Sequence, residues 1–288
     1  MSLHVQVLGS SSGGNSTLLW SGNSAVLVDF GFGPRYIGEG LERNGLDWSN
    51  VRAVLLTHIH NDHVDFFTLK RLAEKKIPVI APAGVLQAFR RQFRGPLMSS
   101  GGILEPLPKT QVRELDAFQF TAFEVPHDSP GGCFGYRVAV TTHNGSRQVA
   151  IATDLGYADN GLPLEFAGSD IVVLESNHDP EMLENSGRPE WLKKRIRDLG
   201  HLSNNQSADL VGRVLSLSEV PPRAILLAHL SQECNTEPIA QNVMTDALKG
   251  FGFSQVGVVV SHASAPSERL SISDNPSPAQ PAHPLGAE

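Results

Sequence analysis

The sequence has few cysteines and no long apolar stretch, and each absence excludes a class of protein. Only two of its 288 residues are cysteines, Cys133 and Cys234, and they lie far apart in the chain. Such a pair does not form the disulfide framework of a small secreted domain, and a reducing compartment suits it better. The first eight residues lack the features of a signal peptide, and no run reaches the ~18 apolar residues of a membrane span. We therefore expect a cytoplasmic protein that has no membrane segment.

Basic charge and aromatic side chains are also scarce. The net charge is −7, the isoelectric point is near 5.9 and aromatic residues make up 7% of the chain. A negative net charge and an acidic isoelectric point are not typical of a general nucleic-acid binder. No aromatic stacking platform is evident, so readout of a base sequence is not expected. Basic residues do gather in one segment, at Arg188, Lys193, Lys194, Arg195 and Arg197. Such a run is often a solvated helix face, but it could also lead a polyanionic strand to a site.

Apolar runs of strand length are plentiful, and 40% of the residues are hydrophobic. The predicted strands lie near residues 4–8, 17–20, 25–29, 53–57 and 77–80 in one series and near 118–125, 134–140, 148–152, 171–175, 224–228 and 256–260 in a second. Helical patterns cover Phe66 to Lys76, the segment after Asn204, and a segment that starts after Thr236 and stops near Gly250. Two β-rich halves with helices outside predict an α/β fold of the four-layer αββα sandwich type.

No interior linker separates two compositions, so one domain is expected over residues 1–263. From Ser264 onward the chain is rich in serine, proline and alanine. Segments of that composition rarely bury enough apolar surface to fold, and we expect residues 264–288 to form a disordered tail.

The stretch Thr57-His58-Ile59-His60-Asn61-Asp62-His63 is the most informative part of the chain. It places four potential metal ligands within six residues, directly after the apolar run 53–56. The ligands therefore lie where a buried strand passes into a loop, which is where sites are commonly built. Imidazole nitrogen and carboxylate oxygen suit Zn²⁺ or a similar first-row dication. A polar loop that is rich in histidine by chance is the alternative, and the density of ligands disfavours it.

Three more predicted strands end in a histidine or an aspartate, at His127, Asp154 and His229. Taken singly, each residue could simply satisfy loop amides. Taken together, they bring seven ligand-type residues to one edge of a sheet, where open α/β sheets gather their sites. One catalytic zinc takes about three protein ligands and a water. Seven ligands fit two metals that share a bridging carboxylate.

The order of these residues resembles the signature of the metallo-β-lactamase-fold hydrolases. The resemblance implies one metal held by three histidines, a second metal held by a further set, and Asp154 as the bridge between them. These implied ligands are His58, His60 and His127 for the first metal, and Asp62, His63 and His229 for the second.

Further motifs narrow the resemblance to the YycJ (WalJ, VicX) group of that superfamily, and it covers the chain from about residue 4 to residue 260. They are Gly9-Ser10-Ser11-Ser12-Gly13-Gly14-Asn15-Ser16, Val125-Pro126-His127-Asp128, Thr153-Asp154-Leu155-Gly156-Tyr157, Glu175-Ser176-Asn177-His178-Asp179, Gly200-His201-Leu202-Ser203-Asn204 and His229-Leu230-Ser231-Gln232-Glu233-Cys234-Asn235. The group is associated with bacterial DNA metabolism, as metal-dependent nucleases. The wider superfamily also holds β-lactamases, thioester hydrolases, RNA-processing nucleases and small-molecule phosphodiesterases.

Several residues near these motifs are candidates for substrate contact. Ser12 and Asn15 lie in a glycine- and serine-rich loop that could bring N–H groups close to an anion, although such a loop can also be a simple tight turn. His201 directly precedes a helix start, where free amides favour phosphate, and a capping-loop histidine is the alternative. His178 is a weaker candidate. Asp29, at the end of a strand, would on the resemblance support the ligand loop from behind.

These observations predict a hydrolase of phosphodiester bonds that uses two divalent cations per chain, most simply a DNA nuclease of the exonuclease kind. The expected metal is Zn²⁺, with Mn²⁺ as the alternative, and the two ions would lower the pKa of a bridging water to give the attacking hydroxide. Asp62, Asp154 and His201 are the expected catalytic residues, while Lys193, Lys194 and Arg195 are expected to bind the DNA or other phosphodiester substrate. The same centre could instead serve a small or cyclic phosphodiesterase, or a thioester or lactone hydrolase. A metal-binding regulator without turnover fits least, because every expected ligand is present.

Overall fold

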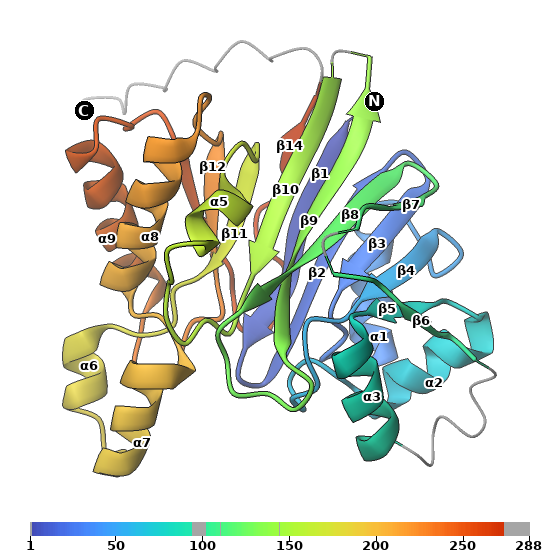
Figure 1. Cartoon of the computed structure of the whole chain (residues 1–288), viewed down its shortest axis with the longest axis horizontal. Coiled ribbons are helices and arrows are strands. Elements are labelled where there is room, and N and C mark those ends of the chain that lie inside the picture. Colours follow the sequence, from blue (N-terminus) through green and yellow to red (C-terminus); the bar gives the residue numbers. More distant parts are fainter. Residues whose placement is uncertain (1, 94–101, 110, 144, 274–288) are drawn as a thin grey trace, which may run out of the picture.

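Two seven-stranded sheets form the centre of the computed structural model, which describes residues 2–93, 102–109, 111–143 and 145–273 (Figure 1). The first sheet has the spatial order β14 (Leu270–Ile272), β1 (Leu3–Ser11), β2 (Gly14–Ser21), β3 (Ser24–Val28), β4 (Val51–Leu55), β5 (Val79–Ala81), β6 (Leu104–Pro106). The second has the order β13 (Gly257–Val260), β12 (Ala224–Ala228), β11 (Ile171–Glu175), β10 (Gly145–Ala152), β9 (Cys133–Thr142), β8 (Phe118–Val125), β7 (Arg113–Leu115). Both sheets mix parallel and antiparallel pairs.

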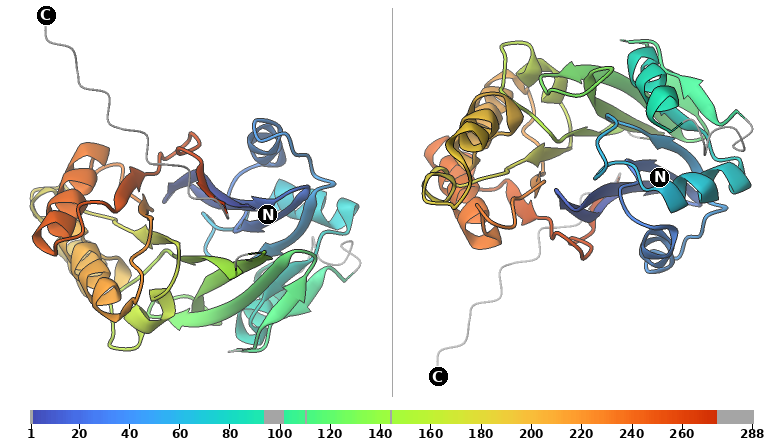
Figure 2. Two further views of the ribbon diagram at one scale, coloured as in Figure 1. Left: turned by 90° about the horizontal axis from the view of Figure 1, so that it is seen from above. Right: turned by 90° about the horizontal axis from the view of Figure 1, so that it is seen from below.

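Helices lie outside the two sheets, as the views from above and below show (Figure 2). The helices near the first sheet are α1 (Pro34–Glu42), α2 (Phe66–Lys75) and α3 (Ala83–Gln92). Those near the second sheet are α5 (Leu162–Phe166), α6 (Pro180–Glu184), α7 (Glu190–Arg195), the π-helical turn η1 (Ile196–Gly200), α8 (Asn204–Leu217) and α9 (Glu237–Gly250). The predicted four-layer αββα sandwich is confirmed.

Two hydrophobic clusters hold these layers together. One lies between the sheets and contains Val5 and Leu18 of the first sheet together with Phe120 and Tyr136 of the second. The other joins the outer face of the second sheet to α8 and α9, and Val211 of α8 belongs to it. Strands β11 and β12 are therefore covered on both faces, and every residue in them is buried. Burial of this kind explains why they read as continuous apolar runs in the sequence.

Helix ends agree with the local sequence signals. Asp65 caps α2 by accepting a hydrogen bond from the N–H of Thr68. Ser203 and Gln206 form a reciprocal capping box at the start of α8, and Thr236 caps α9. Capping of this kind satisfies N–H groups that a helix leaves free in its first turn. The starts of α8 and α9 were predictable for that reason.

The folded domain extends beyond the predicted boundary at residue 263. β14 pairs with the edge of the first sheet, with Leu3 opposite Ile272, and the N–H of Ser267 donates to the carbonyl of Val7. Ile272 is fully buried. The expectation of disorder from Ser264 is therefore wrong for the residues up to 273, because two apolar side chains and a free strand edge outweigh the polar composition around them. The remainder of the predicted tail, 274–288, lies outside the described residues.

Candidate metal centre and active site

The carboxyl ends of parallel strands converge on one edge of the molecule. β3 runs parallel to β4, and β10, β11 and β12 are parallel to one another. Residues that follow such strands meet at the same edge, as the sequence analysis expected. Asp29, Asp154 and His229 follow three of these strands and have left-handed backbone angles, with φ of 62°, 59° and 56°. Non-glycine residues seldom adopt that conformation, and it turns each chain sharply at the end of its strand.

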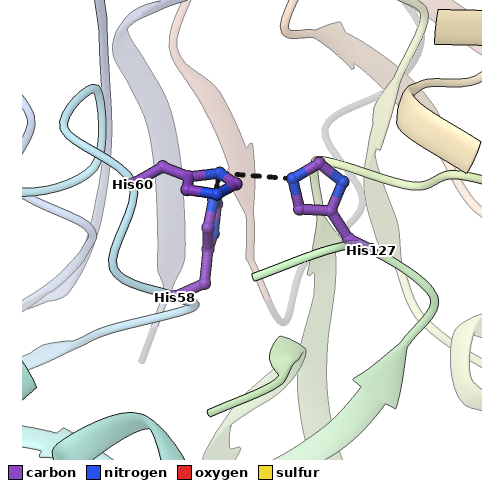
Figure 3. A group of neighbouring side chains, drawn as sticks. All are labelled: His58, His60 and His127. Carbon is purple, nitrogen blue, oxygen red and sulfur yellow. Dashed lines mark hydrogen bonds between the residues drawn. The ribbon is translucent and has the colours of Figure 1, made fainter. Parts of the chain in front are cut away.

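Three histidines form the first ligand group, and Figure 3 shows their rings converging. The Nδ1 atom of His60 lies 3.0 Å from Nε2 of His58 and 3.3 Å from Nε2 of His127. All three candidate ligand atoms lie within 4.8 Å of one another. Three imidazole nitrogens at this spacing suit one first-row dication.

Asp62, His63, Asp154 and His229 form the second group, again with ligand atoms within 4.8 Å of one another. Nε2 of His63 lies 3.0 Å from Asp154 Oδ2 and 3.5 Å from Asp62 Oδ2, and Nε2 of His229 lies 3.5 Å from the same Asp62 oxygen. Asp154 also reaches the first group, because its Oδ1 lies 3.8 Å from Nε2 of His127. One carboxylate thus lies between the two groups.

Neighbouring acceptors fix the orientation of these imidazoles from behind. Nδ1 of His63 lies 2.8 Å from Asp29 Oδ2, and Nδ1 of His127 lies 3.1 Å from the carbonyl oxygen of Gly200. When Nδ1 donates to these oxygens, Nε2 carries no proton and its lone pair faces the other ligands. Asp29 therefore has the supporting position that the resemblance implied.

The residues of the centre fit divalent cations. Among the described residues, the buried atoms Asp154 Oδ2 and His229 Nε2 have no hydrogen-bond partner, although both face the cluster. Buried polar atoms without a partner are uncommon and need an explanation. Oxygen and imidazole donors at this spacing supply one, because a bound dication would satisfy both atoms.

The pKa shifts of the histidines show where negative charge accumulates in the site. Burial by itself lowers the pKa of His229, but Asp154, Asp62 and Glu175 together raise it to about 10. Burial likewise opposes the charge on His63, yet the neighbouring carboxylates, Asp29 first, raise its pKa well above its usual value. The second ligand group is therefore a region of negative potential that attracts cations. The first group differs, since burial lowers the pKa values of His58 and His127 and keeps these imidazoles neutral.

Glu175 is a residue of the site that the sequence analysis named only as part of a motif, with no role assigned to it. It ends β11, is fully buried, and its Oε1 accepts from Nδ1 of both His201 and His229 at 2.8 Å. Its Oε2 accepts from the N–H groups of Leu155 and Leu202. These contacts keep the carboxyl ionised and lower its pKa to about 2 although burial acts in the opposite direction. Its place at the end of an apolar run, like Asp154 and His229, was the signal that could have identified it.

A cavity of about 250 Å³ opens over the two ligand groups. Among the predicted substrate contacts, Ser12, Arg195 and His201 line it. The segment 188–200, which contains α7 and η1, also lines the cavity. It includes Arg188, which was predicted only as part of a basic segment.

The other predicted substrate contacts lie elsewhere. Lys193 is 6% exposed, and its Nζ donates to the carbonyl of Glu184, so it fastens α7 to α6 and does not reach substrate. Lys194 is exposed, pairs with Asp198 and does not line the cavity. The helix turns these two lysines away from the wall that carries Arg195.

Two polar residues predicted to contact substrate are also buried away from the cavity. Asn15 lies beneath the ligands, where its Nδ2 is 3.2 Å from Asp62 Oδ2 and 3.1 Å from His63 Nε2. His178 is 2% exposed and does not line the cavity, and burial lowers its pKa to about 4. Neither residue faces the opening, so the structure does not support the prediction that Asn15 and His178 contact substrate.

Comparison with known proteins agrees with this geometry. The family model of the beta-lactamase superfamily domain matches residues 25–229. The chain belongs to the metallo-β-lactamase superfamily. Exodeoxyribonuclease YycJ of Bacillus anthracis is 29% identical to it over 88% of this chain and 93% of that protein. Exodeoxyribonuclease WalJ of Streptococcus pneumoniae serotype 2 (strain D39 / NCTC 7466) is 31% identical over 84% of this chain and 87% of that protein.

Solved structures of the superfamily share the fold at lower identity. The metallo-beta-lactamase fold protein YhfI from Bacillus subtilis superposes with a TM-score of 0.65 at 17% identity, over 94% of this chain and 100% of that one. The expected membership of the superfamily and the likeness to the YycJ and WalJ group are thus confirmed. Among the described residues of this chain, no helix is both long and apolar enough to cross a bilayer.

Proposed function

We propose that this metal-dependent hydrolase cleaves phosphodiester bonds of DNA in the cytoplasm, as an exonuclease with two divalent cations, Zn²⁺ or Mn²⁺. One observation carries the proposal. Asp154 lies between the two ligand groups, at the floor of a cavity whose wall presents two arginines, Arg188 and Arg195. A paired cation site beneath arginine donors is an arrangement that suits phosphoryl oxygens.

The ligand residues divide into two sets, one for each cation. His58, His60 and His127 would hold one cation, Asp62, His63 and His229 the other, and Asp154 would contact both. When bound, the cations would activate a water molecule and neutralise charge on the phosphate. Glu175 keeps His229 oriented from behind through Nδ1.

The two arginines are held over the cavity by acidic partners. Nη2 of Arg195 lies 2.6 Å from Asp128 Oδ2, and Nε of Arg188 lies 2.9 Å from Glu233 Oε2. A guanidinium has five N–H donors, so each arginine keeps donors free for phosphate oxygens while the pair fixes its position.

His201 is placed to move a proton to the leaving oxygen. Its Nδ1 faces Glu175 Oε1, and the side chain is about one fifth exposed at the cavity wall. Because Glu175 takes one ring nitrogen, Nε2 is the atom available to substrate.

Substrate choice follows from the relatives and from the size of the cavity. Both curated relatives are named exodeoxyribonucleases. The cavity of about 250 Å³ is slightly smaller than most ligand sites, which commonly measure ~300–1,000 Å³. It therefore suits a strand end, where one nucleotide enters at a time. The same volume supports a small phosphodiester as the second candidate substrate.

The test compares substrates side by side. Metal-loaded protein is incubated with end-labelled single- and double-stranded DNA, RNA, bis(p-nitrophenyl) phosphate and a thioester. Release of mononucleotides from DNA ends supports the proposal, and turnover of bis(p-nitrophenyl) phosphate alone would favour the small-substrate candidate. Thioester turnover without phosphodiester turnover would refute both.

Two variants assign the substrate contacts. His201→Ala should retain its metal but lose roughly 10²–10⁴-fold in turnover. Arg195→Ala should weaken DNA binding and reduce its salt dependence, whereas the matched control Lys194→Ala, on the same helix but outside the cavity, should not. Loss of metal from the His201 variant would make that residue a ligand, and equal effects of the two basic substitutions would remove Arg195 from the substrate path.

A further inference from the structure

A second cavity, of about 350 Å³, adjoins the active site. It lies between the loop that follows β12, the first turn of α9 and the loop that follows β13. Ser231 lines both cavities, so only the short segment around it separates them. A strand bound with one phosphate over the ligand groups could therefore extend into this second cavity.

The lining of the cavity combines apolar side chains with one buried polar atom that has no hydrogen-bond partner among the described residues. Leu230, Pro238 and Ala263 contribute apolar surface. Ser261 also lines it and is 2% exposed, and its Oγ has no hydrogen-bond partner among the described residues. A buried hydroxyl without a partner is unfavourable, so a ligand that supplies the partner would bind there with a gain. Apolar faces with a polar edge are the chemistry of a nucleobase.

The charges around the cavity disfavour a phosphate as its occupant. None of its described lining residues is a lysine or an arginine. Glu237 contributes a carboxylate, and its Oε1 is already paired with Nδ1 of His262 at 2.6 Å. The free amides of the first turn of α9 are partly taken by the cap of Thr236. An anion would therefore meet a carboxylate and no unpaired cation.

We propose that this second cavity binds a nucleobase of the DNA strand, next to the phosphodiester that is cleaved. The inference rests on the proposed nuclease function and adds a base-binding subsite to it. One hydroxyl and apolar walls contact the base, so we expect the subsite to bind different bases with similar affinity.

The experiment removes the base and keeps the phosphates. Short fluorescent single strands, with phosphorothioate linkages that slow cleavage, each carry one abasic residue at successive positions from either end. Their affinity for the metal-loaded protein is measured by fluorescence anisotropy. At one position near the cleaved end we expect the abasic residue to weaken binding roughly fivefold or more, because the strand then lacks the base that fills the cavity.

Two variants assign that loss to the cavity. Ala263→Phe, which fills it from the half-buried loop, should make strands with and without the base bind equally, whereas Ala265→Phe, exposed two residues further on and outside the lining, should not. Ser261→Ala should reduce the discrimination without lowering Tm, because no protein partner is lost. Ser169→Ala, at a buried serine before β11 at the opposite end of the sheet, is its control. Ser169 Oγ accepts from Nε2 of Gln148 at 3.0 Å, so this variant should lower Tm and leave the discrimination unchanged. All four variants should hydrolyse bis(p-nitrophenyl) phosphate at the wild-type rate.

The outcomes separate the two proposals. A wild-type protein that cleaves DNA but shows no position-dependent loss with abasic strands refutes the subsite and leaves the nuclease proposal standing. Persistence of the loss in Ala263→Phe also refutes it. A protein that hydrolyses bis(p-nitrophenyl) phosphate and neither binds nor cleaves DNA refutes the nuclease proposal itself.

Discussion

Replacing Glu175 with glutamine tests how the metal centre is held from behind. The carboxyl is buried, and its Oε1 accepts from Nδ1 of His201 and of His229, while Oε2 accepts from two backbone N–H groups. Glutamine has nearly the same shape but only one oxygen. If that oxygen stays with the two backbone donors, the NH₂ group faces both imidazoles, and each must turn its Nδ1 into an acceptor. The proton then moves to Nε2, and His229 loses the lone pair that faces the cluster.

The size of the effect follows from this change of tautomer. Loss of a residue that orients a metal-binding histidine typically lowers metal affinity by roughly 10–100-fold, or about 1.4–2.8 kcal/mol. Turnover falls further because His201 changes tautomer as well. Glu175→Ala is different, since it leaves the N–H groups of Leu155 and Leu202 without an acceptor. At roughly 1–3 kcal/mol for each buried donor, the alanine variant should lose about 2–6 kcal/mol of stability.

Isothermal titration with Zn²⁺ and urea unfolding measure the two quantities separately. The glutamine variant should bind metal more weakly and, in the metal-free state, should lose less stability than the alanine variant, because its oxygen still accepts from the two backbone N–H groups. Glu165→Gln is the matched control, because Glu165 is partly exposed, pairs with Arg137 at 3.7 Å and lies outside both ligand groups. Wild-type metal affinity together with wild-type turnover in Glu175→Gln would refute the proposed role of Glu175.

Three further predictions concern the metals and their support. Elemental analysis should find two divalent ions per chain, and one ion or fewer after saturation would contradict a paired site. Chelation should lower Tm by roughly 5 °C or more, because saturating metal stabilises the folded state by about 2.7 kcal/mol per site at 100 times Kd. Asp154→Asn should reduce hydrolysis to background with an unchanged circular dichroism spectrum, and wild-type activity would show that no bridge is needed. Gly31→Ala should lower the free energy of unfolding by about 1–3 kcal/mol and weaken metal binding, because the added Cβ would overlap the carbonyl oxygen of Asp62, whereas Gly187→Ala, which has open space, should change neither.

Much of the fold was predictable because its strands are strongly apolar and its helices are well capped. The bounds predicted for β8, β11 and β12 agree with the structure. Elements whose stability comes from tertiary contact were missed, among them α3, which has no side-chain cap, and β14, which forms only against the edge of β1. Local patterns do not encode such contacts.

The sequence by itself determined which residues were candidates for the metal centre. His58, His60, Asp62 and His63 are kept together by their spacing in one loop. His127, Asp154 and His229 follow apolar runs that predict strands, and parallel strands end at the same edge of a sheet.

Only the tertiary structure decided which residues face the opening and which lie behind it. Arg195 and Lys193 are two positions apart on one helix, yet the first lines the cavity and the second is buried against Glu184. Glu175 lies beside His229 because β11 and β12 are neighbours in the sheet, and the sequence does not show that pairing. The physical reason is that spacing along the chain fixes which residues are neighbours, whereas the direction of a side chain depends on the rotation and packing of the element that carries it.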